Sequence, residues 1–335
     1  MRVVVSAPIR PEFDRPAFSL LPYLRLMRLP NVFTALSNVA MGFLFVHRSE
    51  ALHEEWPAFS LLLASSACLY IAGMVLNDVF DFAVDKAERP FRPLPSGQVS
   101  LAFARALGFV LLGLGVMTGV AAGWVQANDV APRWLSGAIA LLLAVAIVAY
   151  NGGLKRTPLG PLGMGACRTL NVLLGMSTPV VAFTDPQVLG FAPAQWLVAG
   201  GVGLYVVGIT CFARGEAGVS KQGPLLLGLV LMAGGIAMLA SLPLLFPVVT
   251  TLIRLKPHLA FLLFGLLGFS IVRRAIVALT DPSPQNVQGT VKHALLSIIV
   301  FDAAVTVLIA GPAYGLAVAV LVVPALLLGR WVYST

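Results

Sequence analysis

The sequence predicts an all-α membrane protein in which nine transmembrane helices surround a central cavity and the N-terminus lies in the cytoplasm. Hydrophobic residues make up 59% of its 335 residues and charged residues only 11%, whereas about a quarter of a soluble globular chain is charged. Apolar runs of about 20 residues, the length that crosses a bilayer, recur along the whole chain. The loops between these runs carry lysine and arginine unevenly, which supports the count of nine.

Nine apolar runs are the predicted membrane helices. The third, seventh and ninth runs are long enough to tilt. The fifth contains Gly163, Gly165 and Arg168, so the pattern defines its start poorly. The runs lie near residues 31–47, 59–78, 101–124, 134–150, 162–183, 195–213, 223–248, 258–280 and 300–328.

The placement of basic residues tests this topology. With the N-terminus in the cytoplasm, 17 of the 22 lysines and arginines fall in cytoplasmic segments, as the positive-inside rule requires. An odd number of spans places the C-terminus outside. The net charge of +8 is therefore mainly topological, and dispersed cations argue against a nucleic-acid partner. The five outside residues are Arg48, Arg133, Arg254, Lys256 and Arg330.

The chain is predicted to form one transmembrane domain over residues 23–335, preceded by a flexible cytoplasmic tail over residues 1–22. No apolar signal-peptide core appears before residue 31. The three cysteines show no C-x-x-C spacing, so they predict neither a disulfide framework nor a zinc site.

The segment NDVFDFAVDKAERPFRPLPSG, residues 77–97, carries the clearest functional signal. If the second helix continues through Asp78, Asp81 and Asp85, these carboxylates share one face, with Asn77 one turn before Asp81. Such a face is unstable unless a cation binds, and Mg2+ prefers oxygen ligands that it shares with substrate phosphates. The spacing predicts a Mg2+ site on the three aspartates, assisted by Asn77. The alternative, a solvated charged helix end, explains the strict spacing less well.

Basic residues follow the aspartates directly. Lys86, Arg89 and Arg92 are predicted to hold the non-bridging oxygens of a diphosphate, which arginine binds in bidentate fashion. The prolines after them end the helix and fix the loop that carries the arginines.

These motifs carry a family resemblance. NDVFDFAVD matches the N-D-x-x-D-x-x-x-D signature of the UbiA-type membrane prenyltransferases, and RPFRPLPSGQVS resembles the R-P-L-x-S-G segment that follows it. Nine helices with the N-terminus inside is also the architecture of that family. The resemblance implies Mg2+-dependent transfer of an isoprenyl group from a polyprenyl diphosphate donor to a lipophilic acceptor, aromatic acceptors included, within the bilayer.

The second acidic motif of that family, roughly D-T-x-Y-A-x-x-D, is incomplete in this chain. The matching stretch is ITCFARGE, in which Ile209 stands where the first aspartate is expected and Glu216 retains the second carboxylate. A solvated loop residue is the alternative interpretation of Glu216. Either the nearby Arg214 and Lys221 replace a metal by holding phosphate directly, or ionisation of the donor is impaired.

Two further stretches resemble the family. YNGGLKRTPLGPLG is similar to its Y-x-x-x-K segment, which implies that Tyr150, Lys155 and Arg156 lie at the diphosphate. In GACRTLNVLLGMS, Arg168 and Asn171 share one helical face inside an apolar run, where an unpaired arginine costs about 2.5–3.5 kcal/mol. They are therefore expected to face a polar cavity, and with FDAAV they resemble the EboC-like branch of the superfamily.

Three other polar residues lie within apolar runs. Asp302 requires either a protonated state or a cation such as Lys292, His293 or Arg274, and it is equally explained as an acceptor-orienting group or a structural ion pair. Asn31 and Asn38 could face the same cavity, although hydrogen bonds between helices are the commoner reason for such residues.

Intramembrane isoprenyl transfer is the predicted function, at the inner membrane of a bacterium with the active site facing the cytoplasm. A non-catalytic binder or translocator of a lipophilic secondary-metabolite precursor is the alternative. The missing second aspartate favours that alternative, whereas the intact first motif opposes it. A phosphatidyl-type phosphotransferase would need D-G-x-x-A-R, but Phe82 follows Asp81.

Overall fold

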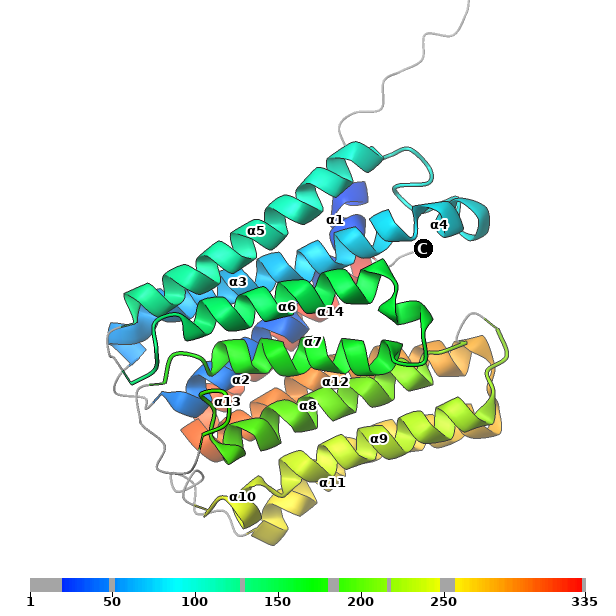
Figure 1. The fold of residues 1–335 in the computed structure, drawn as a ribbon. Coiled ribbons are helices and arrows are strands. Elements are labelled where there is room, and N and C mark those ends of the chain that lie inside the picture. Colours follow the sequence, from blue (N-terminus) through cyan, green and yellow to red (C-terminus); the bar gives the residue numbers. More distant parts are fainter. Residues whose placement is uncertain are drawn as a thin grey trace, which may run out of the picture.

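The fold is a bundle of long helices that run roughly parallel or antiparallel to one another (Figure 1). Within the described part of the chain, helices account for all regular structure except an isolated bridge between Val188 and Phe191. The computed structural model describes residues 20–47, 52–126, 130–179, 187–215, 218–247 and 257–332.

The predicted all-α class is confirmed, and nine helices of the described residues are long and apolar enough to cross a membrane. The first eight helical elements are α1 (Leu21–Met27), the 3-10 helix η1 (Leu29–Asn31), α2 (Val32–Val46), α3 (Leu52–Phe80), α4 (Phe82–Glu88), α5 (Leu101–Val125), α6 (Leu135–Gly152) and the 3-10 helix η3 (Leu154–Arg156). The remaining ones are α7 (Gly160–Gly175), α8 (Pro193–Phe212), α9 (Gln222–Ala240), α10 (Leu242–Leu245), α11 (Pro257–Thr280), α12 (Pro284–Ala310), α13 (Pro312–Ala319) and α14 (Val322–Val332).

Helix α7 differs from its predicted range of 162–183. It has only 16 residues, so it falls below the length of the nine candidate spans, yet it packs between α6 and α8 and against α2. Its first turn contains Pro161, a favoured first-turn residue because proline lacks the amide hydrogen that is unpaired there. Counting α7, ten helical segments run along the bundle in the described part of the chain.

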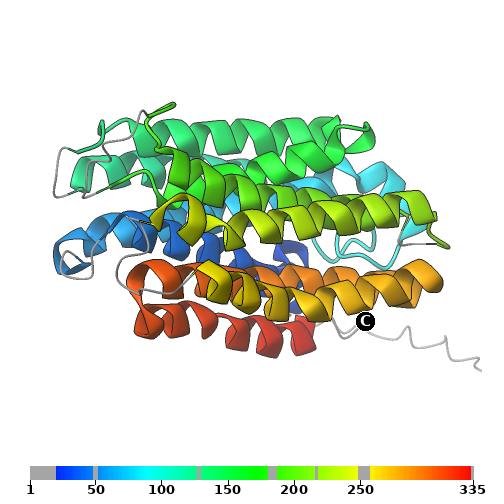
Figure 2. The same ribbon diagram turned by 90° about the horizontal axis from the view of Figure 1, so that it is seen from below.

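The single span predicted over residues 300–328 is wrong. Helix α12 begins at Pro284 and ends at Ala310, and Gly311 then adopts a φ of +100°, which glycine tolerates without steric cost. Pro312 begins the next helix, and α13 and α14 run back along α12, as the red and orange helices of Figure 2 show.

This reversal moves the end of the described chain. Helix α14 packs against η1, and Arg330 lines the same cavity as Asp78. Arg330 therefore lies at the end of the bundle that carries the aspartates, and its predicted place at the opposite end is wrong. Of the predicted tail over residues 1–22, only its last residues are described, and α1 begins within it at Leu21.

Helices α3 and α4 position the acidic residues. The Asp81 amide donates to the Asn77 carbonyl at 3.0 Å, and the Asp85 amide donates to the Asp81 carbonyl at 2.8 Å. Helical hydrogen bonding thus continues across the break at Asp81, which separates the two helices. All three aspartates consequently lie at one end of the bundle.

Close contact between α2 and α7 positions the interior polar residues. A Cβ atom on Gly42 would lie 2.6 Å from the Val172 carbonyl oxygen, and one on Gly175 would meet the Val39 backbone. Small residues allow membrane helices to approach in this way. The approach brings Arg168 of α7 next to Thr34 and Asn38 of α2.

Candidate functional site

An internal cavity of about 330 Å³, which we call the central cavity, lies among η1, α2, α3, α6, α7, α8 and α12. Its volume is near the lower limit of small-molecule sites. Most of its wall is apolar, and several polar side chains also line it. The lining includes Asn31, Leu69, Tyr70, Met74, Asn77, Leu143, Ile147, Tyr150, Arg168, Asn171, Val206, Ile209 and Thr210.

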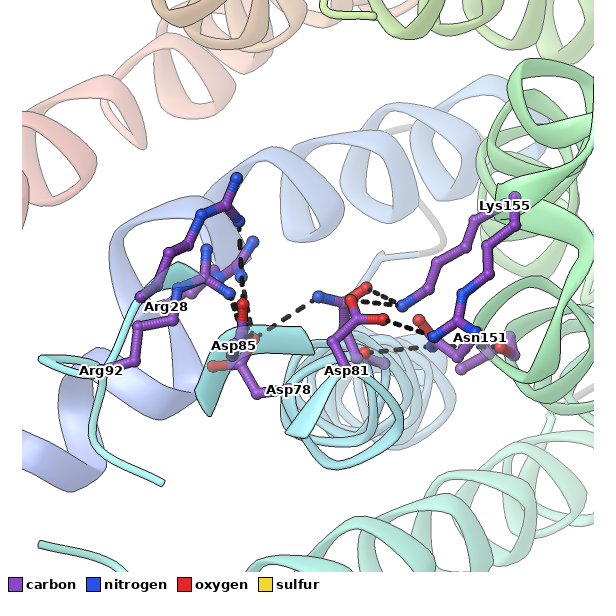
Figure 3. A network of polar contacts seen from close by, with 12 residues as sticks. Arg28, Asp78, Asp81, Asp85, Arg92, Asn151 and Lys155 are labelled. Atoms are coloured by element: carbon purple, nitrogen blue, oxygen red, sulfur yellow. Dashed lines mark hydrogen bonds and ion pairs between the residues drawn. The ribbon is translucent and has the colours of Figure 1, made fainter. Parts of the chain in front are cut away.

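Asp78 and Asp85 form one group of ion pairs at the end of the bundle where α3 meets α4, which we call the mouth (Figure 3). Arg28 donates to Asp78 at 3.0 Å, and Arg92 contacts Asp85 at 2.6 Å and Asp78 at 3.7 Å. Arg89 lies 3.9 Å from Asp85. Both carboxylates are buried, so these cations compensate charges that would be costly to leave unpaired.

Asp81 belongs to a second group, which faces the loop after α6. Lys155 donates to the Asp81 carboxylate at 2.6 Å and to the Asn77 side-chain oxygen at 2.9 Å. Arg156 reaches the other Asp81 oxygen at 3.3 Å. Figure 3 shows the two groups on opposite sides of the α3 end.

The predicted single metal site on three aspartates is therefore not formed as one cluster. Within the described ranges, no three acidic, histidine or cysteine side chains converge so that they could hold one ion. The oxygens instead form two pairs, Asp78 with Asp85 and Asn77 with Asp81. Each pair closes around a nitrogen of a basic side chain, Arg92 in one case and Lys155 in the other.

The oxygen atoms of these side chains are suitable ligands for Mg2+. In each pair, a cationic nitrogen lies between oxygen ligands, so the position already accommodates positive charge. Mg2+ is usually bound through one or two carboxylates, with substrate phosphates and water completing its shell. The residues that would hold it are Asp78 and Asp85 at one position and Asn77 and Asp81 at the other.

The structure does not bring every predicted cation to this mouth. Lys86 and Lys221 are exposed, and neither lines the central cavity. Arg214 is also exposed and donates to the Thr157 carbonyl, which joins the loop after α8 to the loop after η3. Glu216 lies outside the described residues. Ile209 and Thr210 line the cavity, so the wall that α8 contributes carries no carboxylate within its described residues.

Arg168 is the basic group inside the bundle, as its position in an apolar run predicted. It donates to Thr34 at 2.8 Å and to Asn38 at 3.1 Å, and its guanidinium lies over the Tyr70 ring at 5.4 Å. It also lines the central cavity. The expectation that Arg168 faces a cavity and has polar partners agrees with this placement.

Asp302 has different partners from those expected. Ser37 donates to its carboxylate at 2.6 Å and Asn38 donates at 2.8 Å, and among the described residues neither Lys292, His293 nor Arg274 forms an ion pair with it. Asn38 thus connects Asp302 to Arg168. Neither Asn38 nor Asp302 lines the central cavity, so they position Arg168 from outside the cavity wall.

Asn31, Tyr150 and Asn171 all line the central cavity. The Asn171 side chain is already used, because it accepts from Ser66 at 2.7 Å and donates to the Ala35 carbonyl at 2.9 Å. Asn171 therefore also joins α7 to α2 and α3.

Sequence reasoning missed three residues of this site: Arg28, Tyr70 and Asn151. Arg28 has a left-handed backbone, φ 46° and ψ 46°, and this turn between α1 and η1 aims it at Asp78. Its position just before Pro30 and the first span is the signal that could have drawn attention to it. Asn151 donates to the Gly73 and Ile147 carbonyls, and Tyr70 carries no recognisable pattern.

Curated digeranylgeranylglyceryl phosphate synthases are similar to less than half of this chain. A digeranylgeranylglyceryl phosphate synthase of Ignicoccus hospitalis is 36% identical over 137 residues, 41% of this chain and 40% of that protein. One from Methanosarcina barkeri is 31% identical over 169 residues, 48% of this chain and 55% of that protein. The chain spans about half the length of the curated relatives it matches. These relatives are archaeal and do not support a specific place in the EboC-like branch or in a bacterial membrane.

Solved structures share the fold. A UbiA homologue from Aeropyrum pernix aligns with a TM-score of 0.61 at 20% identity, over 82% of this chain and 97% of that one. A UbiA homologue from Archaeoglobus fulgidus, solved with GPP and Mg2+, aligns with a TM-score of 0.50 at 17% identity, over 89% and 99%. The UbiA prenyltransferase family model matches residues 35–289, well over half of the chain, and the protein therefore belongs to the UbiA prenyltransferase family.

Proposed function

We propose that this protein transfers an isoprenyl group from an isoprenyl diphosphate to a lipophilic acceptor within the membrane. The observation that carries the proposal is an apolar cavity whose polar mouth pairs Asn77 and Asp81 with Lys155, next to Asp78 and its arginines. An amphiphile with an apolar chain and a diphosphate head matches this division.

The basic residues supply the charge stabilisation. As the bond between C1 of the donor and the diphosphate oxygen breaks, the electron pair stays with the diphosphate. Arg28, Arg92 and Lys155 already bind carboxylates at 2.6–3.0 Å, and phosphate oxygens are equally suitable partners for them. Donors that are fixed before the reaction stabilise developing charge without further reorganisation. When bound, Mg2+ supplies additional neutralisation of the leaving diphosphate.

The apolar wall protects the allylic cation. Leu69, Leu143 and Ile147 line the cavity, and such apolar side chains offer water no hydrogen bond beside the reacting carbon. The acceptor then donates an electron pair to C1 and releases a proton, which completes the transfer.

Ile209 favours a second candidate function. Because α8 offers an apolar side chain where the family pattern has aspartate, a binder or translocator that holds the amphiphile without cleaving it would need no further carboxylate. Turnover separates the two functions.

The test uses the purified full-length protein in nanodiscs with radiolabelled geranylgeranyl diphosphate, Mg2+ and a panel of lipid acceptors. We expect diphosphate release that stops when EDTA removes Mg2+. Asp78→Asn and Asp81→Asn should each reduce release by at least about 100-fold, the effect of losing one fixed electrostatic group. Glu88→Gln, an exposed carboxylate on α4, is the matched control. Tight donor binding without release in the unmodified protein would support the binder instead.

A further inference from the structure

Asn151, near the end of α6, has an unused hydrogen-bond acceptor and lines the central cavity. The residue is 4% exposed, and its side-chain oxygen Oδ1 accepts no hydrogen bond from any residue that the structure describes. A buried polar atom that stays unpaired costs free energy, so most such atoms in proteins have a partner. Asn151 is therefore a candidate contact for a molecule that enters the cavity.

Two hydrogen bonds fix the orientation of the Asn151 amide group. Its nitrogen Nδ2 donates to the Gly73 carbonyl at 3.2 Å and to the Ile147 carbonyl at 3.1 Å. If the amide were turned over, Oδ1 would face these two carbonyl oxygens, and acceptors would meet acceptors. The amide therefore uses both of its donors on the backbone and leaves its acceptor for another group.

The contact with Gly73 places Asn151 close to the expected position of the diphosphate. Gly73 precedes Asn77 on α3 by about one helical turn, or about 6 Å along the helix axis. Asn77 and Asp81 bind Lys155 where the diphosphate is expected, and Figure 3 shows Asn151 on the same side of the α3 end as Lys155. C1 of the donor is the carbon bonded to the diphosphate, so we expect Asn151 to line the part of the cavity next to C1.

The partner of Oδ1 must supply a hydrogen-bond donor. The isoprenyl chain has none, and the oxygens of a diphosphate are mainly acceptors. The hydroxyl group of an acceptor supplies one. Water also supplies one, but water next to C1 would capture the allylic cation, and closure of the cavity around its substrates excludes water from that position.

We propose that Asn151 Oδ1 accepts a hydrogen bond from the hydroxyl group of the acceptor, and that Asn151 thereby selects acceptors with such a group. This role rests on the proposed function, because it needs donor and acceptor in one cavity. The hydroxyl oxygen forms a bond to C1 as the bond from C1 to the diphosphate breaks, and the electron pair of that bond leaves with the diphosphate. The proton of the resulting oxonium then passes to the diphosphate. Asn151 is neutral and binds the acceptor without taking its proton.

The test compares menthol with menthone on the full-length protein in nanodiscs without donor or Mg2+. The two compounds share one carbon skeleton, but menthol carries a hydroxyl group where menthone carries a ketone, so only menthol donates a hydrogen bond. Displacement of radiolabelled menthol measures both affinities. We expect menthol to bind at least about fivefold more tightly than menthone, the effect of one hydrogen bond to a buried group. Equal affinity for the two compounds, or the absence of displaceable menthol binding, would overturn the proposal.

Variants assign this preference to Asn151. Asn151→Leu should abolish the preference for menthol over menthone, because leucine has no acceptor atom. Ser65→Ala is the matched control, since it removes a buried hydrogen bond between α3 and α5 but no group that lines the central cavity, and it should keep the preference. A preference that persists in Asn151→Leu would refute the assignment. The comparison of the two compounds in the unmodified protein stands even if Asn151→Leu does not fold.

The failure of this role is distinguishable from a failure of the proposed function. Diphosphate release from geranylgeranyl diphosphate with Mg2+, measured without any acceptor, tests the proposed function alone. Release from a protein that binds menthol and menthone equally would refute the role of Asn151 only. Preference for menthol without any diphosphate release would refute the proposed transfer and leave Asn151 as a contact for a hydroxyl-bearing ligand.

Discussion

At the scale of single residues, each carboxylate at the mouth is paired with a basic side chain. Lys155 and Arg156 are adjacent in sequence but differ in burial and in the number of side chains that they contact. The side chain of Lys155 is 12% exposed and bridges Asn77 and Asp81, whereas that of Arg156 is 60% exposed and contacts Asp81 alone. A fixed, mostly buried charge acts more strongly than a solvated one.

Substitutions of Lys155 and Arg156 should therefore differ in their effect on catalysis. Lys155→Gln should lower kcat/KM for diphosphate release by at least about tenfold, because it removes a positioned cation. Arg156→Gln should lower it by less than about fivefold, because exposed charges are screened by water. Steady-state release with labelled donor measures both. An Arg156→Gln effect as large as that of Lys155→Gln would show that the bridge to Asn77 has no particular role.

Residue spacing predicted part of this site and could not predict the rest. The helical spacing of Asp78, Asp81 and Asp85 placed all three at one end of the bundle. Their division into two groups depends on Arg28 and Lys155, which approach from distant segments. The predicted partners of Asp302 were wrong for the same reason, because its actual partners, Ser37 and Asn38, lie on α2, far away in the sequence.

At the scale of helices, the contact between α2 and α7 holds the polar interior together. Arg168 donates to two side chains of α2, and Asn171 donates to the Ala35 carbonyl of the same helix. These hydrogen bonds form only if the backbones approach closely, which Gly42 and Gly175 permit. The glycines and the polar residues therefore depend on one another.

Gly175→Ala should separate α2 from α7 and destabilise the protein. The added methyl group would meet the Val39 backbone, which cannot move aside like a side chain, so we expect a loss of about 1–3 kcal/mol in stability. Gly113→Ala on α5 is the matched control, because a Cβ atom there meets nothing within 4 Å. Thermal melting in detergent compares the two variants. Equal melting temperatures would show that α2 and α7 can separate at no cost.

Hydropathy predicted most helices well and failed at the last one. Helix α12 begins with polar residues, including Gln285, Asn286 and Lys292, so its first turns resembled a loop. The break at Gly311 and Pro312 was hidden because apolar residues continue on both sides of it. Periodicity and hydropathy do not show where an apolar run folds back on itself.

At the scale of the whole molecule, that fold-back changes the topology. Together with α7, the helices of the described residues make an even number of passages along the bundle, so α1 and the end of α14 lie at one end. Arg330 then joins the other cations there, which strengthens the asymmetry of basic charge. By the positive-inside rule, we expect this end to face the cytoplasm.

Cysteine labelling tests the topology. In a background with Cys68, Cys167 and Cys211 replaced by serine, single substitutions Ser96→Cys and Arg330→Cys mark the mouth, and Leu189→Cys marks the opposite end of the bundle. A membrane-impermeant maleimide should label Leu189→Cys in intact right-side-out vesicles, and the other two only after permeabilisation. If Arg330→Cys reacted together with Leu189→Cys, α14 would end on the far side of the membrane. Arg330 could then not share a cavity with Asp78, because a side chain cannot line a site at the other surface of the bilayer.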